Sequence, residues 1–268
     1  MFPLLVSYGP LHIQTMSVLL ALAFLVAAFV FWRKGKEDYY PEDQLFDGFL
    51  VASAMGFVGA RVGYILLHSE TMGWNVLSWF NLVGAPGMSG AIGLLVASFV
   101  LYRFAVQKKW DAFEVLDFWV VAVSLGMVFT SIGSFASGID VGYPTSMPWG
   151  IVFPGLVETH HPAQLYAAGF FFSLFLYLSW LESRYRTFQW YRATKKAAET
   201  GFLLCMYSIF TALFLLVVGF VKPPTIELFD INIDRVASLV LLIFGVALLY
   251  VRSGRTLGFK KKKKRLFA

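Results

Sequence analysis

The chain has 268 residues and is poor in charge, cysteine and histidine. Only 14% of its residues are charged and 58% are hydrophobic, which excludes an ordinary soluble domain and indicates a polytopic membrane protein. A single cysteine, Cys205, excludes an intrachain disulfide, and its place inside an apolar run suggests that it packs like a small hydrophobic residue. With four histidines and this lone thiol, we expect neither a metal site nor any other cofactor.

Long apolar runs predict the fold class. A helix needs about 20 apolar residues to cross a hydrocarbon core about 30 Å thick, and its backbone must satisfy its own hydrogen bonds there. Seven runs meet this need approximately, at 11–32, 48–67, 88–104, 115–135, 162–181, 201–221 and 236–251. We therefore predict an all-α membrane protein with seven transmembrane helices in a single domain, 1–268.

The distribution of basic residues predicts the orientation, because Lys and Arg collect in cytoplasmic loops. Alternate loops and the C-terminal tail hold nineteen of the 22 basic residues, among them the run from Lys260 to Lys264. The N-terminus is therefore expected outside and the C-terminus in the cytoplasm. The polybasic tail, 252–268, is expected to attract anionic lipid headgroups, and nothing in the pattern calls for nucleic acid.

Arg61 is the one charged residue between positions 48 and 67. A cation at membrane depth costs several kcal/mol, so it usually faces a helix bundle interior and has a polar or anionic partner. The alternative is that Arg61 snorkels to the lipid headgroups, about ten Å away past the end of the run. Gly56, Gly59 and Gly63 allow close helix packing around it, which favours an enclosed guanidinium whose fork holds a phosphate.

Other polar and small residues gather at the same expected depth, in the outer half of the membrane. The outside loop around 136–161 is the longest connection and is rich in Gly, Pro, Ser and Thr, as binding loops often are. His161-Pro162 begins the fifth helix and leaves N–H groups ready for an anion, unless His161 simply caps the helix. Aromatic residues near helix ends, such as Trp149, fit an interfacial belt.

Six segments, in chain order, resemble the prolipoprotein diacylglyceryl transferases, a family of seven-helix bacterial inner-membrane enzymes. They are Tyr8-Gly9-Pro10, Gly59-Ala60-Arg61-Val62-Gly63-Tyr64, Gly87-Met88-Ser89-Gly90-Ala91-Ile92-Gly93, Asp117-Phe118, Val152-Phe153-Pro154-Gly155 and His161-Pro162-Ala163-Gln164-Leu165-Tyr166. The last segment is the most specific, since it follows the family's H-P-x-Q-L-Y. The resemblance covers most of the chain and implies a multi-pass protein of the bacterial plasma membrane.

The resemblance also implies an activity: transfer of the diacylglyceryl group of phosphatidylglycerol to the thiol of a lipobox cysteine in a lipoprotein precursor. Such chemistry needs a cation at the phosphate and help in deprotonating a thiol, whose ordinary pKa is about 8.5. It implies catalytic roles for Arg61 at the phosphate and His161 at the thiol. The implied substrate-binding residues are Arg61, Tyr64, Ser131, Ser134, Ser137, Gln164 and Tyr166.

The chain departs from the family at polar positions. The family's G-R-x-G-N-F-x-N-x-E falls on 130–139, where Ser131, Ser134 and Ser137 replace an arginine and two asparagines, and Ile139 replaces the glutamate. The family's histidine has no counterpart after Ser89. Further departures are at Thr15, Met16, Ala167 and Thr211. Serine hydroxyls donate hydrogen bonds but carry no charge, so a phosphate would be less well compensated.

Two functions therefore stay open. One is a working transferase with altered machinery, and the other is a non-catalytic relative that binds phospholipid or a lipoprotein precursor. A small transporter is a weaker third, because the chain shows no two-half symmetry.

Overall fold

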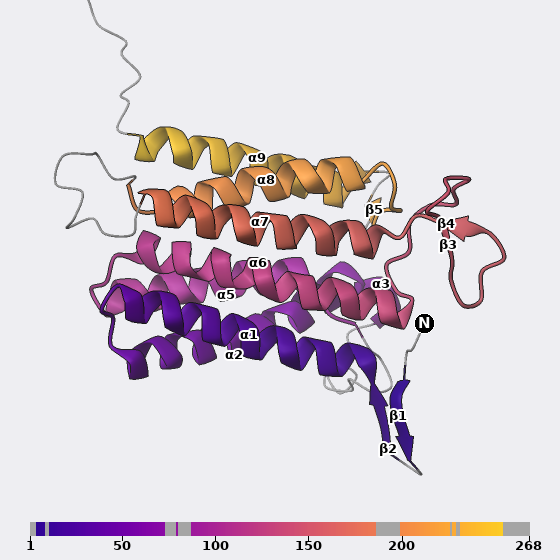
Figure 1. Ribbon diagram of the computed structural model, residues 1–268, viewed down its shortest axis with the longest axis horizontal. Helices are drawn as coiled ribbons and strands as arrows, with labels where there is room; N and C mark the ends of the chain where they lie inside the picture. Colours follow the sequence, from indigo (N-terminus) through magenta and orange to yellow (C-terminus); the bar gives the residue numbers. More distant parts are fainter. Residues whose placement is uncertain are drawn as a thin grey trace, which may run out of the picture.

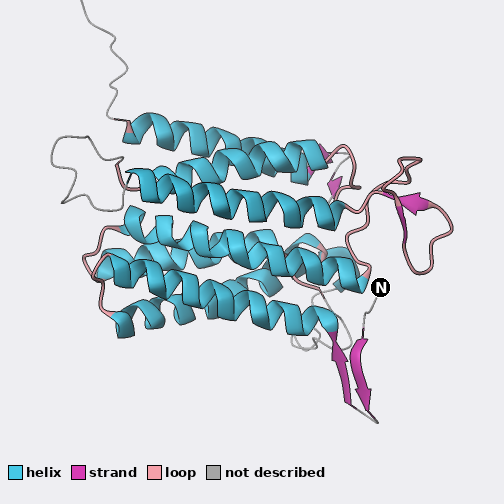
Figure 2. Cartoon of the chain, in the orientation of Figure 1, coloured by secondary structure: helices cyan, strands magenta, loops and turns pink. Residues whose placement is uncertain are grey.

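The computed structural model describes residues 4–8, 11–72, 79, 87–185, 199–225, 227–228 and 231–253. This part of the chain forms a bundle of helices that run alternately up and down, with short β-hairpins at one end (Figures 1 and 2). The helices are α1 (Thr15–Glu37), α2 (Glu42–Leu67), α3 (Ser69–Met72), α5 (Gly90–Gln107), α6 (Ala112–Ser137), α7 (Ala163–Tyr185), α8 (Phe202–Val218) and α9 (Ile233–Arg252). Each predicted apolar run overlaps one of the seven long helices in this part of the chain, and α2 begins six residues before its predicted run.

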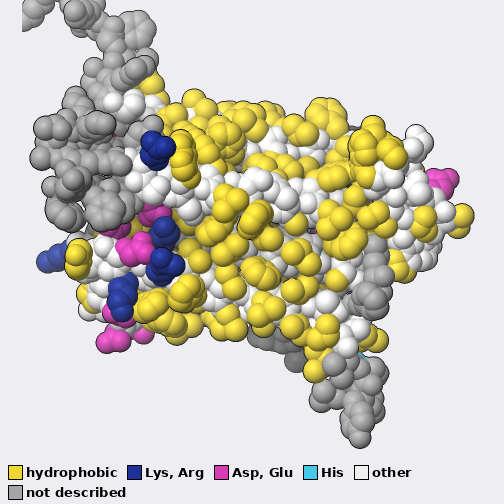
Figure 3. Space-filling view, in the orientation of Figure 1, with side chains coloured by type: hydrophobic (Ala, Val, Ile, Leu, Met, Phe, Trp, Pro, Cys, Tyr) yellow, Lys and Arg dark blue, Asp and Glu magenta, His cyan; other side chains and the backbone are white. Residues whose placement is uncertain are grey.

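Six of these helices, α1, α2, α5, α6, α7 and α9, are long and apolar enough to cross a membrane. The seventh, α8, is apolar but has only 17 residues. Many large hydrophobic side chains on the bundle's flank are exposed, as the yellow surface in Figure 3 shows. A flank of this kind suits lipid, and the chain is a multi-pass membrane protein.

The prediction that the first helix starts at position 11 is wrong. Residues Leu11–Gln14 form strand β2, which pairs antiparallel with β1 (Leu4–Tyr8), and α1 begins at Thr15. The sequence Leu-His-Ile-Gln alternates apolar and polar residues, which is the period of a strand. Hydropathy averaged over a long window misses that alternation.

The two ends of the bundle differ in chemistry. One, called the basic end here, carries the α1–α2 and α5–α6 connections and the last turns of α7 and α9, where the described Lys and Arg gather (Figure 3). The other, called the hairpin end, carries β1–β2, β3 (Ile151–Val152) with β4 (Thr159–His160), and β5 (Glu227–Leu228) with β6 (Ile231–Asn232).

The most buried helix is α6, which packs mainly between α1 and α7 and carries buried residues over most of its length. Toward the basic end, the rings of Phe31, Phe49 and Trp119 pack against one another with centroids 5.7 to 6.3 Å apart. Aromatic pairs at such distances add stability beyond the area they bury. This layer fixes α1, α2 and α6 relative to one another.

Glycines bring α2 and α5 into close contact. A Cβ on Gly56 would lie 2.9 Å from the Cβ of Ala97 and 3.0 Å from the carbonyl oxygen of Gly93. A Cβ on Gly63 would lie 2.6 Å from Ile92. The predicted small-residue contact is therefore confirmed, and it places the turn that carries Arg61 directly against α5.

Polar side chains tie the helices at the basic end. Lys34 of α1 forms an ion pair with Glu182 of α7, and both side chains are largely buried. Tyr40, between α1 and α2, donates to Glu114 of α6 at 2.6 Å. Burial, together with this bond to a carboxylate, raises the pKa of the Tyr40 hydroxyl above its ordinary value. These contacts join α1 to α7 and the α1–α2 connection to α6 at the basic end.

Asp117 performs a structural task that its motif did not reveal. This fully buried carboxylate on α6 accepts hydrogen bonds from the backbone N–H groups of Gly201 and Leu204, each at 2.8 Å. Gly201 is the N-cap residue of α8 and Leu204 lies in its first turn, so neither N–H group has a partner within that helix. Asp117 therefore caps α8 from a neighbouring helix.

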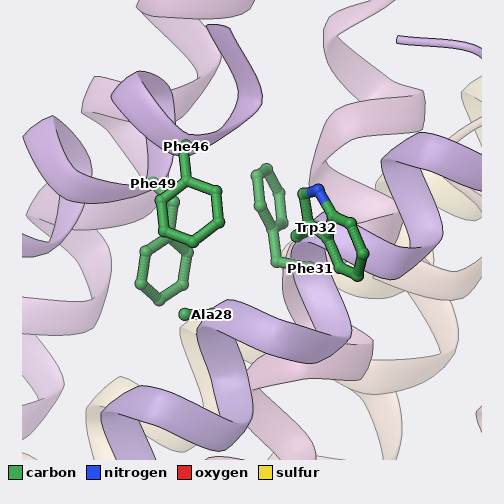
Figure 4. A pocket seen from close by; sticks show the side chains of 5 residues that line it. All are labelled: Ala28, Phe31, Trp32, Phe46 and Phe49. Atoms are coloured by element: carbon green, nitrogen blue, oxygen red, sulfur yellow. The ribbon is translucent and has the colours of Figure 1, made fainter. Parts of the chain in front are cut away.

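A small apolar recess lies between α1 and α2, lined by Ala28, Phe31, Trp32, Phe46 and Phe49 (Figure 4). It holds about 140 Å³ of space not filled by atoms, and that space is too narrow for a water molecule. We regard it as a packing gap between aromatic rings, not as a ligand site.

Candidate functional site

Arg61 is held inside the bundle at the hairpin end. Its side chain is only 7% exposed, and it does not extend into solvent. The Nε atom donates to the carbonyl oxygen of Trp79 and one terminal nitrogen donates to the carbonyl oxygen of Gly87, both at 2.9 Å. The enclosed position is thus observed, and snorkelling is not.

The segment at Gly87 is shaped to meet α2. Gly87 has φ of +150°, which L side chains rarely adopt, and a Cβ there would lie 2.2 Å from the ring of Tyr64. The ring of Tyr64 stacks on His68 at 4.2 Å, and Ser89 N–H donates to Ala60 O at 2.9 Å. Glycine is therefore required for the carbonyl of residue 87 to reach Arg61.

A second group of candidates lies where α6 ends. Ser131 and Ser134 are buried, and Ser137 is in the last turn of the helix. Gly138 has φ of +71°, the left-handed C-cap, and Ile139 N–H donates back to Ser134 O at 3.1 Å. The hydroxyl of Ser137 is enclosed and has no hydrogen-bond partner in the described part of the chain.

The start of α7 is joined to this end of α6 by Gln164. The side chain of Gln164 is 3% exposed, and its Nε2 donates to the carbonyl oxygen of Ile139 at 2.5 Å. Its Oε1 is enclosed and, like Ser137 Oγ, has no partner among the described residues. Buried polar atoms are nearly always paired, so two at one helix junction mark a site suited to water or a polar ligand group.

His161 lies just before α7 and is half-buried. Its Nδ1 is 3.2 Å from the hydroxyl of Tyr166, one helical turn further on. That hydroxyl accepts a hydrogen bond from Nε1 of Trp149 at 2.8 Å. Nε2 of His161 has no hydrogen bond to any described residue. Within the described residues, the histidine is thus hydrogen-bonded through one ring nitrogen only.

The loop before His161 is anchored to the end of α8. Gly142 N–H donates to His161 O at 3.0 Å, and Tyr143 N–H donates to Val221 O at 2.8 Å. Next to that contact, Lys222 pairs with Asp140 at 2.6 Å. The sequence analysis did not single out Lys222 as a candidate.

The structure therefore brings the candidates together in two groups. At the α6–α7 junction, Gln164 binds Ile139, two residues after Ser137, and His161 at the start of α7 binds Tyr166. Arg61 and Tyr64 both lie against Gly87. The hydrogen bonds given above do not link the groups. Ser131 and Ser134 lie deeper along α6. Both groups are at the hairpin end, so they share one end of the bundle.

The profile of the prolipoprotein diacylglyceryl transferase family matches residues 3–251. The chain belongs to that family. The match runs from before α1 to Val251 in the last turn of α9, so it covers all the long helices described above. It therefore shows common descent of the whole bundle.

Several relatives carry the name phosphatidylglycerol–prolipoprotein diacylglyceryl transferase. One from Campylobacter hominis is 29% identical, over 91% of this chain and 88% of its own length. One from Aliarcobacter butzleri is 30% identical, over 93% of each chain. One from Clostridium tetani is 26% identical, over 92% of this chain and 96% of its own. The chain is thus similar to full-length members of the prolipoprotein diacylglyceryl transferase family.

Proposed function

We propose that this protein transfers the diacylglyceryl group of phosphatidylglycerol to the thiol of a cysteine in a lipoprotein precursor. The names of its relatives supply the reaction, and one observation of this chain supports it above others. A guanidinium is buried at the hairpin end and fixed at 2.9 Å by two backbone carbonyl oxygens. A cation fixed in advance in a low-dielectric site stabilises charge that develops on a leaving phosphate.

The reaction is a substitution at the glycerol carbon that carries the phosphate ester. The thiol sulfur forms the new C–S bond as the C–O bond breaks, and the bonding electron pair stays on the phosphate oxygen. The thiol proton leaves to solvent or to the released glycerol phosphate. The products are a thioether and glycerol phosphate, and the step needs no oxidant, metal or other cofactor.

Each candidate residue has a role in this scheme. Arg61 provides the positive charge toward the phosphate, with Tyr64 beside it. Ser131, Ser134 and Ser137 offer hydroxyl donors along α6, and Gln164, Tyr166 and His161 shape the α7 side. Lys222, whose ammonium pairs with Asp140, lies next to the Val221 carbonyl that anchors the loop before His161.

The proposal includes an orientation and a location. The hairpin end faces outward and the basic end faces the cytoplasm of a bacterium, with the protein in its inner membrane. The excess of Lys and Arg at the basic end supports this orientation. A precursor that crosses the membrane would then present its cysteine on the side of Arg61 and His161. The tail, 254–268, lies outside the described residues, and we propose that it binds anionic lipid.

A second candidate function is binding without turnover. Two donor groups of Arg61 are already engaged by carbonyl oxygens, and serines occupy the positions of an arginine and two asparagines. Both features favour a relative that holds a phospholipid or a lipoprotein precursor at the hairpin end without cutting the ester.

The test is a lipidation assay with the purified protein in nanodiscs, a lipobox peptide and phosphatidylglycerol labelled in its glycerol backbone. Mass spectrometry of the peptide is expected to show the diacylglyceryl thioether. Arg61→Ala is expected to lower the rate by about 100-fold or more, the usual loss when one fixed donor at a developing charge is removed. Arg61→Lys keeps the positive charge without the forked donor, so its rate is expected to lie between those of the wild type and Arg61→Ala.

Arg184→Ala is the matched control, because Arg184 is exposed at the basic end, where its side chain lies over Trp180. It is expected to keep the wild-type rate. No thioether with any phospholipid donor would refute the transferase. Phospholipid that co-purifies with wild type and is lost in Arg61→Ala, again without thioether, would establish the binding function instead.

A further inference from the structure

Trp149 is the first residue in a chain of two hydrogen bonds that ends at His161. Its indole Nε1 is 2.8 Å from the hydroxyl oxygen of Tyr166, and that oxygen is 3.2 Å from Nδ1 of His161. The rings of His161 and Tyr166 meet edge to face at 6.2 Å. The aromatic-belt interpretation of Trp149 does not account for this directed contact.

The donor and acceptor inventory fixes the direction of the chain. An indole N–H only donates, so the hydroxyl oxygen of Tyr166 must accept from Trp149. Tyr166 still has its own proton to donate, and in the described part of the chain the acceptor in reach is Nδ1 of His161. The opposite arrangement, with a proton on Nδ1, would give the phenol oxygen two donors and leave its own proton to water. Accepting from Trp149 also makes Tyr166 a stronger donor.

We propose that Trp149 is a positioning residue which, through Tyr166, holds neutral His161 with its proton on Nε2. Nε2 has no partner among the described residues, so it presents this N–H to whatever occupies the site. This inference rests on the proposed function for the identity of that occupant, an anionic phosphate oxygen of the lipid. The alternative role, expected from the resemblance, was that His161 takes the thiol proton.

A protonated Nε2 has no lone pair with which to accept that proton. In the scheme inferred here, Nε2–H therefore hydrogen-bonds to the phosphate oxygen that gains the electron pair as the C–O bond breaks. No proton passes from His161, and the balance of the substitution is unchanged. The hydrogen bond strengthens as negative charge grows on the oxygen, which lowers the barrier.

The test begins with nitrogen NMR of the full-length protein in nanodiscs, with ¹⁵N-labelled histidine. The signal of His161 is identified by its loss in His161→Gln. Its shifts are expected to show a bare Nδ1 and a protonated Nε2 in the resting protein. Trp149→Phe, which removes the donor at an exposed position, and Tyr166→Phe are each expected to produce a mixture of the two tautomers.

The matched control is Trp180→Phe. Trp180 is 50% exposed, close to the 55% of Trp149, but it lies at the other end of α7 without a link to a histidine. It is expected to leave the His161 shifts and the transfer rate unchanged. Trp149→Phe is expected to lower kcat about tenfold, the fold-change of one hydrogen bond, with the KM for phospholipid unchanged.

A proton on Nδ1 in the wild-type protein would overturn the inference, whatever the activity. So would Trp149→Phe shifts and rates equal to those of Trp180→Phe, because the indole would then be only part of the interfacial belt. If the tautomer is as expected and no thioether forms, the positioning role stands and the transferase proposal fails. The two claims are thus tested separately.

Discussion

Replacing Asp117 by alanine is expected to destabilise the bundle by about 4 kcal/mol. The carboxylate is fully buried and accepts two backbone N–H groups of α8, each at 2.8 Å. Alanine leaves both donors enclosed without a partner, and each such loss costs about 1–3 kcal/mol. It also removes a negative charge from the N-terminal end of α8, which adds up to about 1 kcal/mol.

Asp111→Ala provides a control of the same chemistry. Asp111 caps α6 by accepting from Phe113 N–H at 3.0 Å and Glu114 N–H at 3.3 Å, but it is exposed, so water replaces it at a cost of about 1 kcal/mol. Asp117→Asn, with one acceptor oxygen left, is expected to lose about half of the alanine effect. The assay is reversible unfolding in mixed micelles with increasing SDS. Equal losses in the two alanine variants would refute the reasoning, because burial would then not decide the cost.

Two further pairs of variants test the close packing of α2 against α5 and the ion pair between Lys34 and Glu182. Gly56→Ala is expected to cost about 1–3 kcal/mol in the same assay, since the added carbon meets Ala97 at 2.9 Å, whereas Gly169→Ala, with nothing within 4 Å, is expected to be neutral or slightly stabilising. Equal effects would show that α2 and α5 do not need close contact. Glu182→Gln is expected to cost about 3–5 kcal/mol because it leaves Lys34 without its partner in a largely buried position, and the double variant Lys34→Met with Glu182→Leu is expected to recover most of that loss. A double variant as unstable as the single one would contradict this.

The helices follow closely from the sequence because their cause is local. An apolar run must form its own hydrogen bonds in lipid, so its length and position fix a helix with an error of a few residues. The ends were predicted less well. The first helix loses Leu11–Gln14 to a strand, and α8 stops at Val218, three residues earlier than expected, shortly before Pro223 and Pro224. In both places a short-range pattern competes with the average hydropathy.

The candidate site follows from the sequence in part. Arg61 is predictable because a buried charge is costly enough to need a structural reason, and its enclosure is confirmed. The hydrogen bond from Gln164 to Ile139 and the link from Trp149 to His161 were not predictable. Both depend on how a loop folds back across the bundle, and no periodicity in the sequence records that path.

The two ends of the bundle differ in whether their buried polar groups have partners, and this difference indicates which end binds substrate. At the basic end, Asp117 satisfies two enclosed donors and Lys34 pairs with Glu182. At the hairpin end, Ser137 Oγ and Gln164 Oε1 are enclosed without partners in the described residues. Buried polar atoms usually lack protein partners only where water or a ligand forms hydrogen bonds with them. The unpaired atoms lie at the α6–α7 junction, with Gln164 three residues after His161, so that junction is where we expect a polar part of the substrate to bind.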